Sequence, residues 1–279
     1  MKIFIRTRGK IADYAFIGEA PSVQWWREFQ DATSVEKPTL IVEGDGQQWR
    51  CFLSAIPSSR VDRVGTSARY SIAVQGACGE DIRPIISLVG AWLKDVTLGT
   101  VGRTVQSAVD SIFEEDTVER LLSLRESTPD SVAEVEKLSL LALSKFTSAI
   151  EPVDKSTEGS WVGSTDSSDA KHKFLSRCTD VLSGKFEGCT AVVNLLGNEK
   201  EATDFVSEFN LRKPRSSIML LIDDIGCPLK RIEKKNPIHD HAIPAHSKAM
   251  GSLLIPAVLI MATILMAIWA LTPGTPPPP

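Results

Sequence analysis

The chain has 279 residues, with 31 Lys or Arg against 35 Asp or Glu and a formal net charge of −4 at pH 7. General nucleic-acid binders are basic, so this charge argues against broad binding to phosphate backbones and leaves room only for a local basic site. The five cysteines form no CxxC pair, and we therefore expect buried free thiols, with no metal and no cofactor.

The first 80 residues predict mainly β structure. Short apolar runs such as KIFIR, PTLIVEG, WRCFLSAI and YSIAVQG are separated by Gly, Pro, Asp and Ser. The first of these runs is too short and too charged for a signal peptide. One helix is expected to interrupt the strands at 22–31, where Trp25, Trp26 and Phe29 recur at helical spacing.

The densest polar segment, SSRVDRVGTSARY at 58–70, is expected to form a turn between two of these strands. Guanidinium groups beside a Gly-Thr-Ser loop hold phosphate or carboxylate through charge-assisted hydrogen bonds. We therefore interpret the segment as a site for an anionic small molecule. Its candidate ligand-binding residues are Arg60, Asp62, Arg63, Thr66 and Arg69. The alternative is a solvated hairpin with surface ion pairs, since no Walker A or GxGxxG pattern is present.

From residue 81 to about 150 the pattern turns helical, and we expect three helices or more. The apolar face of the last of them contains Val132, Val135, Leu138, Leu141, Ala142 and Phe146. A polar stretch at 151–169 is the best internal boundary by composition. Beyond it, the apolar runs CTAVVNLLG and SSIMLLIDD flank the helical EKEATDFVSEF, which predicts a small parallel strand–helix–strand unit covered on both faces.

Candidate catalytic residues are few. Asp223 and Asp224 follow an apolar strand, at the end where open α/β sheets often present acidic groups, but a strand-ending turn is the preferred interpretation. No serine lies in a GxSxG elbow. Three of the four histidines crowd 239–246, with a spacing that matches no standard zinc module. The catalytic residues are therefore unknown, and an enzyme is not the favoured interpretation.

The strongest pattern of the chain lies at its end. Residues 250–271 run for 22 residues without a charge, and such a helix is about 33 Å long, enough to cross a hydrocarbon layer of about 30 Å. Only eight residues follow, so we expect a tail-anchored, single-pass membrane protein. Residues 230–248 carry five Lys or Arg against two acidic residues, which places the N-terminal side in the cytoplasm by the positive-inside rule.

The membrane segment has one face of small and hydroxylated side chains. At 100° per residue this stripe contains Ser252, Pro256, Thr263, Ala267 and Ala270. Small residues let helices approach closely, so we expect a transmembrane interface between several copies of the chain. The alternative is chance clustering, because small residues are common in membrane helices.

Together these patterns predict an α+β cytosolic region, with a β-rich N-terminal part, a helical middle and a small βαβ unit, followed by one C-terminal transmembrane helix. The expected division has five parts: a β-rich then helical domain at 1–150, a polar linker with the small α/β unit at 151–229, a basic juxtamembrane linker at 230–249, the membrane helix at 250–271 and a proline-rich tail at 272–279.

Two classes of function fit this organisation. In the first, the cytosolic domain senses a ligand or partner and controls an oligomer of anchors that opens a pore or disrupts the membrane. In the second, an enzyme or scaffold is tethered to the cytoplasmic face of the membrane. We prefer the first, because no catalytic constellation is present and the anchor has a polar-small stripe.

The chain resembles the membrane effectors of bacterial anti-phage defence systems in the order of its domains. In both, a cytosolic sensor is followed by a transmembrane segment. Some of these effectors are gated by nucleotide signals. The resemblance implies a nucleotide or other anionic small molecule as the signal, and the bacterial inner membrane as the location.

Overall fold

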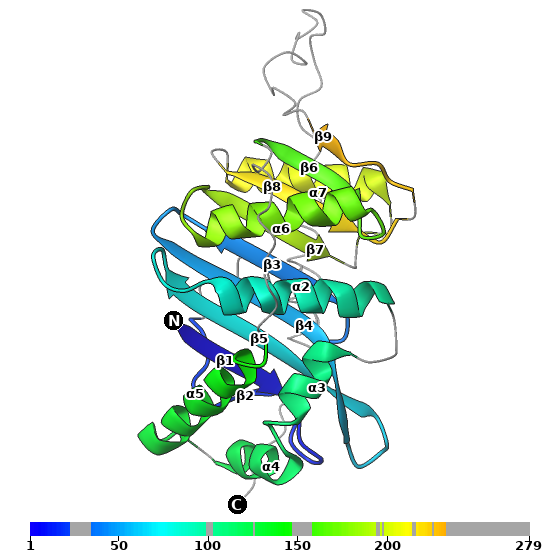
Figure 1. Ribbon diagram of the computed structural model, residues 1–279. Coiled ribbons are helices and arrows are strands. Elements are labelled where there is room, and N and C mark those ends of the chain that lie inside the picture. Colours follow the sequence, from blue (N-terminus) through cyan, green and yellow to red (C-terminus); the bar gives the residue numbers. More distant parts are fainter. Residues whose placement is uncertain are drawn as a thin grey trace, which may run out of the picture. The chain divides into compact units, whose positions relative to one another are not determined.

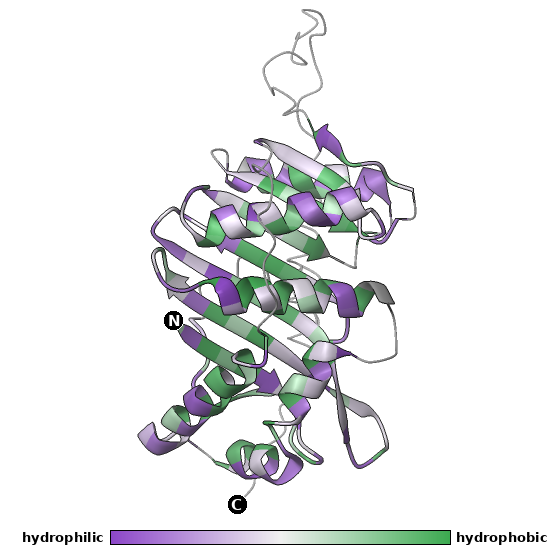
Figure 2. Ribbon diagram, in the orientation of Figure 1, coloured by the Kyte–Doolittle hydropathy of each residue, from purple (hydrophilic) through white to green (hydrophobic). Residues whose placement is uncertain are grey.

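The computed structural model describes residues 1–22, 35–98, 103–124, 126–146, 158–193, 196, 198–213, 216–224 and 226–232. In this part of the chain the strands form one nine-stranded sheet with the order β2-β1-β5-β4-β3-β7-β8-β6-β9 (Figure 1). Six helices accompany the sheet in the described residues, so the fold is mixed α/β. Figure 2 shows hydrophobic residues gathered along the middle of the strands.

The N-terminal part of the sheet is antiparallel throughout, and its strands confirm the β structure predicted for the first 80 residues. Its strands are β1 (Lys2–Thr7), β2 (Ala15–Ile17), β3 (Thr39–Gly44), β4 (Gln48–Val61) and β5 (Ser67–Ala77). The longest two, β4 and β5, form a hairpin around the polar segment, which confirms the predicted turn. The helix predicted at 22–31 falls almost entirely outside the described residues.

Four helices follow, which confirms the helical middle of the chain. They are α2 (Arg83–Leu98), α3 (Thr104–Asp110), α4 (Glu115–Ser123) and α5 (Pro129–Leu143). Helix α5 begins at a capping box, in which Thr128 and Ser131 exchange side-chain to backbone hydrogen bonds. The predicted apolar face of α5 is wrong at Leu141, which is 48 % exposed, whereas Leu143 is buried. Helical spacing alone did not distinguish between these neighbouring leucines.

The C-terminal part adds α6 and α7 to four more strands. Its elements are β6 (Ser160–Ser164), α6 (Ser168–Leu182), β7 (Gly188–Val193), α7 (Glu199–Arg212), β8 (Ser217–Ile222) and β9 (Lys230–Ile232). Strands β7 and β8 are parallel and joined by α7, which confirms the predicted strand–helix–strand unit. Strand β6 is parallel to β8, and β9 pairs antiparallel with β6.

Both faces of β8 are covered, which explains why its sequence, SIMLLI, is almost continuously apolar. On β8, Met219 and Leu221 pack in the cluster with α6, whereas Ile218, Leu220 and Ile222 pack in the cluster with α7. Figure 1 shows α2 and α6 in front of the sheet and α7 behind it. The two helices on opposite faces therefore hold β8 between two apolar layers.

The two parts of the sheet meet where β3 pairs antiparallel with β7, from Thr39 opposite Val193 to Gly44 opposite Gly188. The polar stretch 151–169, predicted as a boundary, contains strand β6 and the start of α6, and the segments before and after it contribute to one sheet. Residues 1–235 form one compact unit. The predicted juxtamembrane linker begins within this unit, because Lys230–Ile232 are strand β9.

No helix among the described residues has the length and apolar character needed to cross a bilayer. The predicted membrane helix at 250–271 and its stripe, Ser252, Pro256, Thr263, Ala267 and Ala270, lie outside the described residues. The transmembrane part of the predicted fold class therefore stays a prediction.

Two glycines test the packing of α6 on the sheet. A Cβ on Gly163 of β6 would lie 3.0 Å from the Ala170 Cβ and 3.0 Å from the Leu229 Cδ1, whereas a Cβ on Gly90 of α2 would meet nothing within 4 Å. We expect Gly163→Ala to lower the free energy of unfolding by about 1 to 3 kcal/mol. Gly90→Ala should raise it by about 0.5 to 1 kcal/mol, because alanine favours the helix.

Urea denaturation of the two variants, followed by tryptophan fluorescence, measures both changes. Equal stabilities for Gly163→Ala and Gly90→Ala would contradict the close approach of β6 and α6.

Candidate functional site

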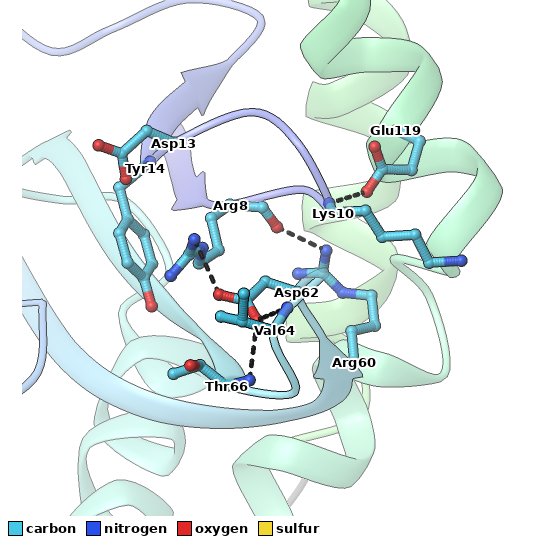
Figure 3. A network of polar contacts seen from close by, with 9 residues as sticks. All are labelled: Arg8, Lys10, Asp13, Tyr14, Arg60, Asp62, Val64, Thr66 and Glu119. Carbon is cyan, nitrogen blue, oxygen red and sulfur yellow. Dashed lines mark hydrogen bonds and ion pairs between the residues drawn. The ribbon is translucent and has the colours of Figure 1, made fainter.

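The predicted anion site lies at the tip of the β4–β5 hairpin (Figure 3). The turn is closed by the Asp62 N–H, which donates to the Thr66 carbonyl at 2.9 Å, and by the Gly65 N–H, which donates to the Asp62 carbonyl at 3.1 Å. Gly65 has φ +82°, a conformation that suits glycine. The Arg63 N–H donates to the Lys10 carbonyl at 3.3 Å, which ties the tip to the loop after β1.

Asp62 stabilises this turn from within. Its Oδ1 accepts hydrogen bonds from the Val64 N–H at 2.9 Å and the Thr66 N–H at 2.8 Å, and its Oδ2 lies 3.0 Å from the Arg8 Nη2. The hydrogen bond from Thr66 is the main reason why the pKa of Asp62 lies below its ordinary value; Val64 and the Arg8 charge lower it further. The carboxylate is therefore engaged by this protein's own groups.

Arg60 lies within β4 and is buried, with 8 % of its surface exposed. Its Nη1 donates to the Arg8 carbonyl at 2.8 Å and its Nη2 to the Thr7 Oγ1 at 2.6 Å. Its Nε donates to the Tyr70 hydroxyl at 3.3 Å, and the guanidinium lies over the Tyr70 ring, 4.9 Å from its centroid. Arg60 thus fastens β4 to the end of β1, with its charge directed into the protein.

The same network reaches α3. The Tyr70 hydroxyl donates to the Asp110 Oδ1 at 3.1 Å, and Asp110 also accepts from the Ser58 hydroxyl at 2.7 Å and the Ser59 N–H at 2.7 Å. Burial is the main reason why the pKa of Tyr70 is raised, so its hydroxyl keeps its proton and continues to donate. The base of the hairpin is therefore fixed on one side by β1 and on the other by α3.

The five predicted site residues do not converge on one cavity. Arg60 and Asp62 are turned inward, Arg63 and Thr66 are exposed at the tip, and Arg69 is half-buried. Arg69 lines a small cavity of about 100 Å³ under the first turn of α3, together with Trp92, Asp95 and Arg103. Arg60 and Asp62 are buried and bonded to the protein's own groups, so they do not form the surface ion pairs of the solvated-hairpin alternative, whereas Arg63, Thr66 and Arg69 stay accessible as candidates.

A larger polar pocket lies elsewhere, at the end of the sheet where β3 and β5 finish and β7 and β8 begin. It has a volume of about 420 Å³. On its floor the Glu43 carboxylate, 10 % exposed, lies between two cations: Arg50 donates to Oε2 from Nε at 3.1 Å and from Nη2 at 2.9 Å, and the Lys213 ammonium pairs with Oε1. Gln75, Asp45 and Glu187 complete the polar lining.

This pocket is not among the sites predicted from the sequence. One signal was present, because Glu43 and Arg50 are charged residues within otherwise apolar strands, and they lie directly opposite each other in the β3–β4 register. A charged pair facing one side of a buried sheet indicates a polar site there. Lys213 follows α7, and nothing in its local sequence connects it with Glu43.

Asp223 and Asp224 follow β8 as predicted, with Asp223 exposed. The Cys227 N–H donates to the Asp224 carbonyl at 3.2 Å, as in a strand-ending turn. Across the described residues, no group of three or more His, Cys, Asp or Glu side chains is placed to hold a metal ion.

Comparison with known proteins gives no relative: no family model, no curated protein and no solved structure matches the chain. The function must therefore be argued from the residues themselves.

Arg60 and Arg63 are a matched pair, three positions apart on the same hairpin. We expect Arg60→Gln to lower the free energy of unfolding by roughly 2 to 4 kcal/mol, because it leaves buried polar groups of Thr7 and Arg8 without their donor. Arg63→Gln should change it by less than about 0.5 kcal/mol, as is usual for an exposed side chain. Chemical denaturation measures both, and an Arg60→Gln variant of unchanged stability would return Arg60 to the list of ligand contacts.

The lowered pKa of Asp62 predicts an acid-dependent part of the stability. The ionised carboxylate stabilises the fold above its unfolded pKa of about 4, and this contribution is lost as the pH falls through the lower folded pKa. We expect Asp62→Asn to lower Tm at neutral pH and to reduce the fall of Tm between about pH 4 and pH 2. Asp223→Asn, at an exposed position, is the control, and an identical acid profile for the two variants would contradict this assignment.

Proposed function

We propose that the protein is a single-pass membrane effector, in which the α/β domain senses a ligand or partner and controls an oligomeric transmembrane assembly. The observation that carries the proposal is the segment 250–271, which runs for 22 residues without a charge. Its length matches a hydrocarbon layer of about 30 Å. The basic flank at 230–248 supports an orientation with the α/β domain in the cytoplasm, most simply at the bacterial inner membrane.

The stripe of small and hydroxylated residues supports assembly of several copies. A single apolar helix cannot surround water in a bilayer, because ions need a polar path. A pore therefore requires several helices with Ser252 and Thr263 turned inward. Disruption of the membrane by the assembled helices is the other route to the same outcome, and both fit a role in anti-phage defence.

The α/β domain supplies the sensing part of the proposal. Arg63, Thr66 and Arg69 remain accessible on the hairpin and suit an anionic small molecule or nucleotide. The domain has no catalytic constellation among its described residues that would favour an enzyme. If the experiment contradicts the effector function, the alternative is an enzyme or scaffold tethered to the membrane.

The test compares four forms of the protein expressed in bacteria: the full chain, a deletion of 250–279, Thr263→Leu and Leu265→Val. The full chain should enter the membrane fraction and depolarise or arrest the cells. The protein that lacks 250–279 should be absent from the membrane fraction. Thr263→Leu should stay in the membrane but lose the effect on membrane potential, because it removes a hydroxyl from the stripe.

Leu265→Val is the matched control, because position 265 lies on the opposite side of the helix and should retain full effect. Membrane potential is read with a voltage-sensitive dye. Cells that tolerate the full chain at normal potential, with protein that is monomeric in detergent, would replace the effector by the tethered enzyme or scaffold. Membrane attachment of the deletion would overturn the anchor itself.

A further inference from the structure

The small cavity beside Arg69 has apolar walls and lies between the β4–β5 hairpin, α2 and the first turn of α3. Its volume is about 100 Å³. The wall residues Ile56, Trp92 and Val105 are each 2 % exposed or less, whereas Arg69 is half-buried and so borders the opening. A buried apolar wall with a few polar groups near the opening is usual for a small-molecule site.

A β-bulge shapes this cavity. The β4–β5 pairing shifts register between Leu53 and Ile56, and in the described part of the chain Ala55 alone among non-glycine residues has a positive φ, +55°. Neighbouring residues of a regular strand face opposite sides, whereas the consecutive residues Ala55, Ile56 and Pro57 all line the cavity. The bulge therefore turns a stretch of β4 into one wall of a hollow.

Arg69 brings a positive charge to the opening. It lies opposite Pro57 in the β4–β5 register, and its carbonyl accepts from the Thr7 hydroxyl at 2.9 Å. Within the described residues its guanidinium has no hydrogen-bond or ion-pair partner. A half-buried guanidinium has lost part of its hydration, so an acceptor that reaches it gains charge-assisted hydrogen bonds.

Two other charged residues line the cavity. Asp95 of α2 is engaged by the start of α3: its Oδ1 accepts from the Thr104 N–H at 3.0 Å and its Oδ2 from the Val105 N–H at 2.8 Å. Arg103 has other interactions, and a ligand contact with Arg69 does not require it. Because Asp95 lies in the same lining, it would repel a second negative charge, so a singly charged anion is favoured over a doubly charged one.

The volume limits the size of the ligand. A cavity of about 150 Å³ holds a benzene molecule, so the 100 Å³ of this cavity admits only a few atoms beyond a charged group. A nucleotide is much larger than this space.

We propose that the cavity binds a short-chain monocarboxylate of about three or four carbons, with its carboxylate on Arg69 and its apolar chain against Trp92 and Ile56. The parallel N–H groups of a guanidinium match the two oxygens of a carboxylate. This names the class of anionic molecule for one of the accessible hairpin residues. Its role as the signal rests on the proposed effector function, whereas the binding itself does not.

The test uses the full chain in detergent and five probes: propionate, propionamide, hexanoate, inorganic phosphate and adenosine monophosphate. NMR titration measures each Kd. Propionate should bind at least about tenfold more tightly than propionamide, which has the same shape without the charge. Hexanoate should bind more weakly than propionate, because its chain exceeds the cavity, and neither phosphate nor the nucleotide should displace propionate.

The comparison of propionate with propionamide needs no variant of the protein. Equal Kd values for these two probes, or tighter binding of hexanoate, phosphate or the nucleotide, overturns the proposal.

Three variants locate the bound molecule. Arg69→Gln should raise the Kd of propionate about tenfold, and Arg69→Lys should raise it less, because lysine keeps the charge without the paired donors. Val96→Phe, which fills the cavity and changes no charge, should abolish binding. An unchanged Kd in either Arg69→Gln or Val96→Phe would also overturn the proposal.

Lys94→Gln is the matched control. Lys94 is exposed on α2, next to Asp95 in sequence, and does not line the cavity. Its Kd for propionate should stay within about twofold of that of the unchanged protein, as expected for a screened charge without contact to the ligand. A loss as large as that in Arg69→Gln would contradict a direct contact with Arg69.

The outcome is separate from that of the effector test. Propionate binding by a protein that leaves membrane potential unchanged would retain the site and remove the effector function. Depolarisation by a protein that binds no short carboxylate would do the reverse.

Discussion

The pairing of β3 with β7 is the constraint on which the rest of the described structure depends. It joins an antiparallel part, formed before residue 80, to a mainly parallel part formed after residue 158. Every residue of β3 is buried, so the junction is covered on both faces. Because the pairing is antiparallel, the end of β3 meets the start of β7, with Gly44 opposite Gly188. The polar pocket lies at this meeting point.

The helices reinforce the junction from both faces. On one face, α2 covers the antiparallel half and α6 the parallel half, and their side chains belong to one continuous apolar cluster. On the other face, a second cluster links α7 with side chains of β1, β3 and β4, among them Phe4, Ile41 and Phe52. Each of the two apolar layers therefore contains side chains from both sequence segments that build the sheet.

Features that depend on neighbouring residues could be predicted from the sequence. The hairpin around Gly65, the helices after residue 81 and the β7–α7–β8 unit all follow from local periodicity and turn residues. The structural role of Arg60 could not be predicted in this way, because its partners Thr7 and Arg8 are more than 50 positions away in the sequence. The cluster of arginines in the sequence predicts a ligand site, whereas in the structure Arg60 forms buried hydrogen bonds within the protein.

The pocket illustrates the same limit. Glu43 and Arg50 face each other across a tight hairpin, a relation that alternation along two strands indicates. Lys213 is 170 positions from Glu43 and reaches it only because α7 returns the chain along the sheet. The pairing of β3 with β7 also could not be predicted from local sequence. The composition of an apolar strand does not determine which other strand it pairs with.

The two outermost strands of the described sheet are short, and this has a consequence for the behaviour of the protein at high concentration. Strand β2 and strand β9 have three residues each, and β9 carries Lys230 and Arg231. A long, flat, apolar edge offers unpaired backbone groups to another chain and invites aggregation. Here the long apolar strands are all interior, and each margin presents a strand too short for a second sheet to extend. The short edge strands therefore disfavour pairing of this broad sheet with the sheet of another molecule.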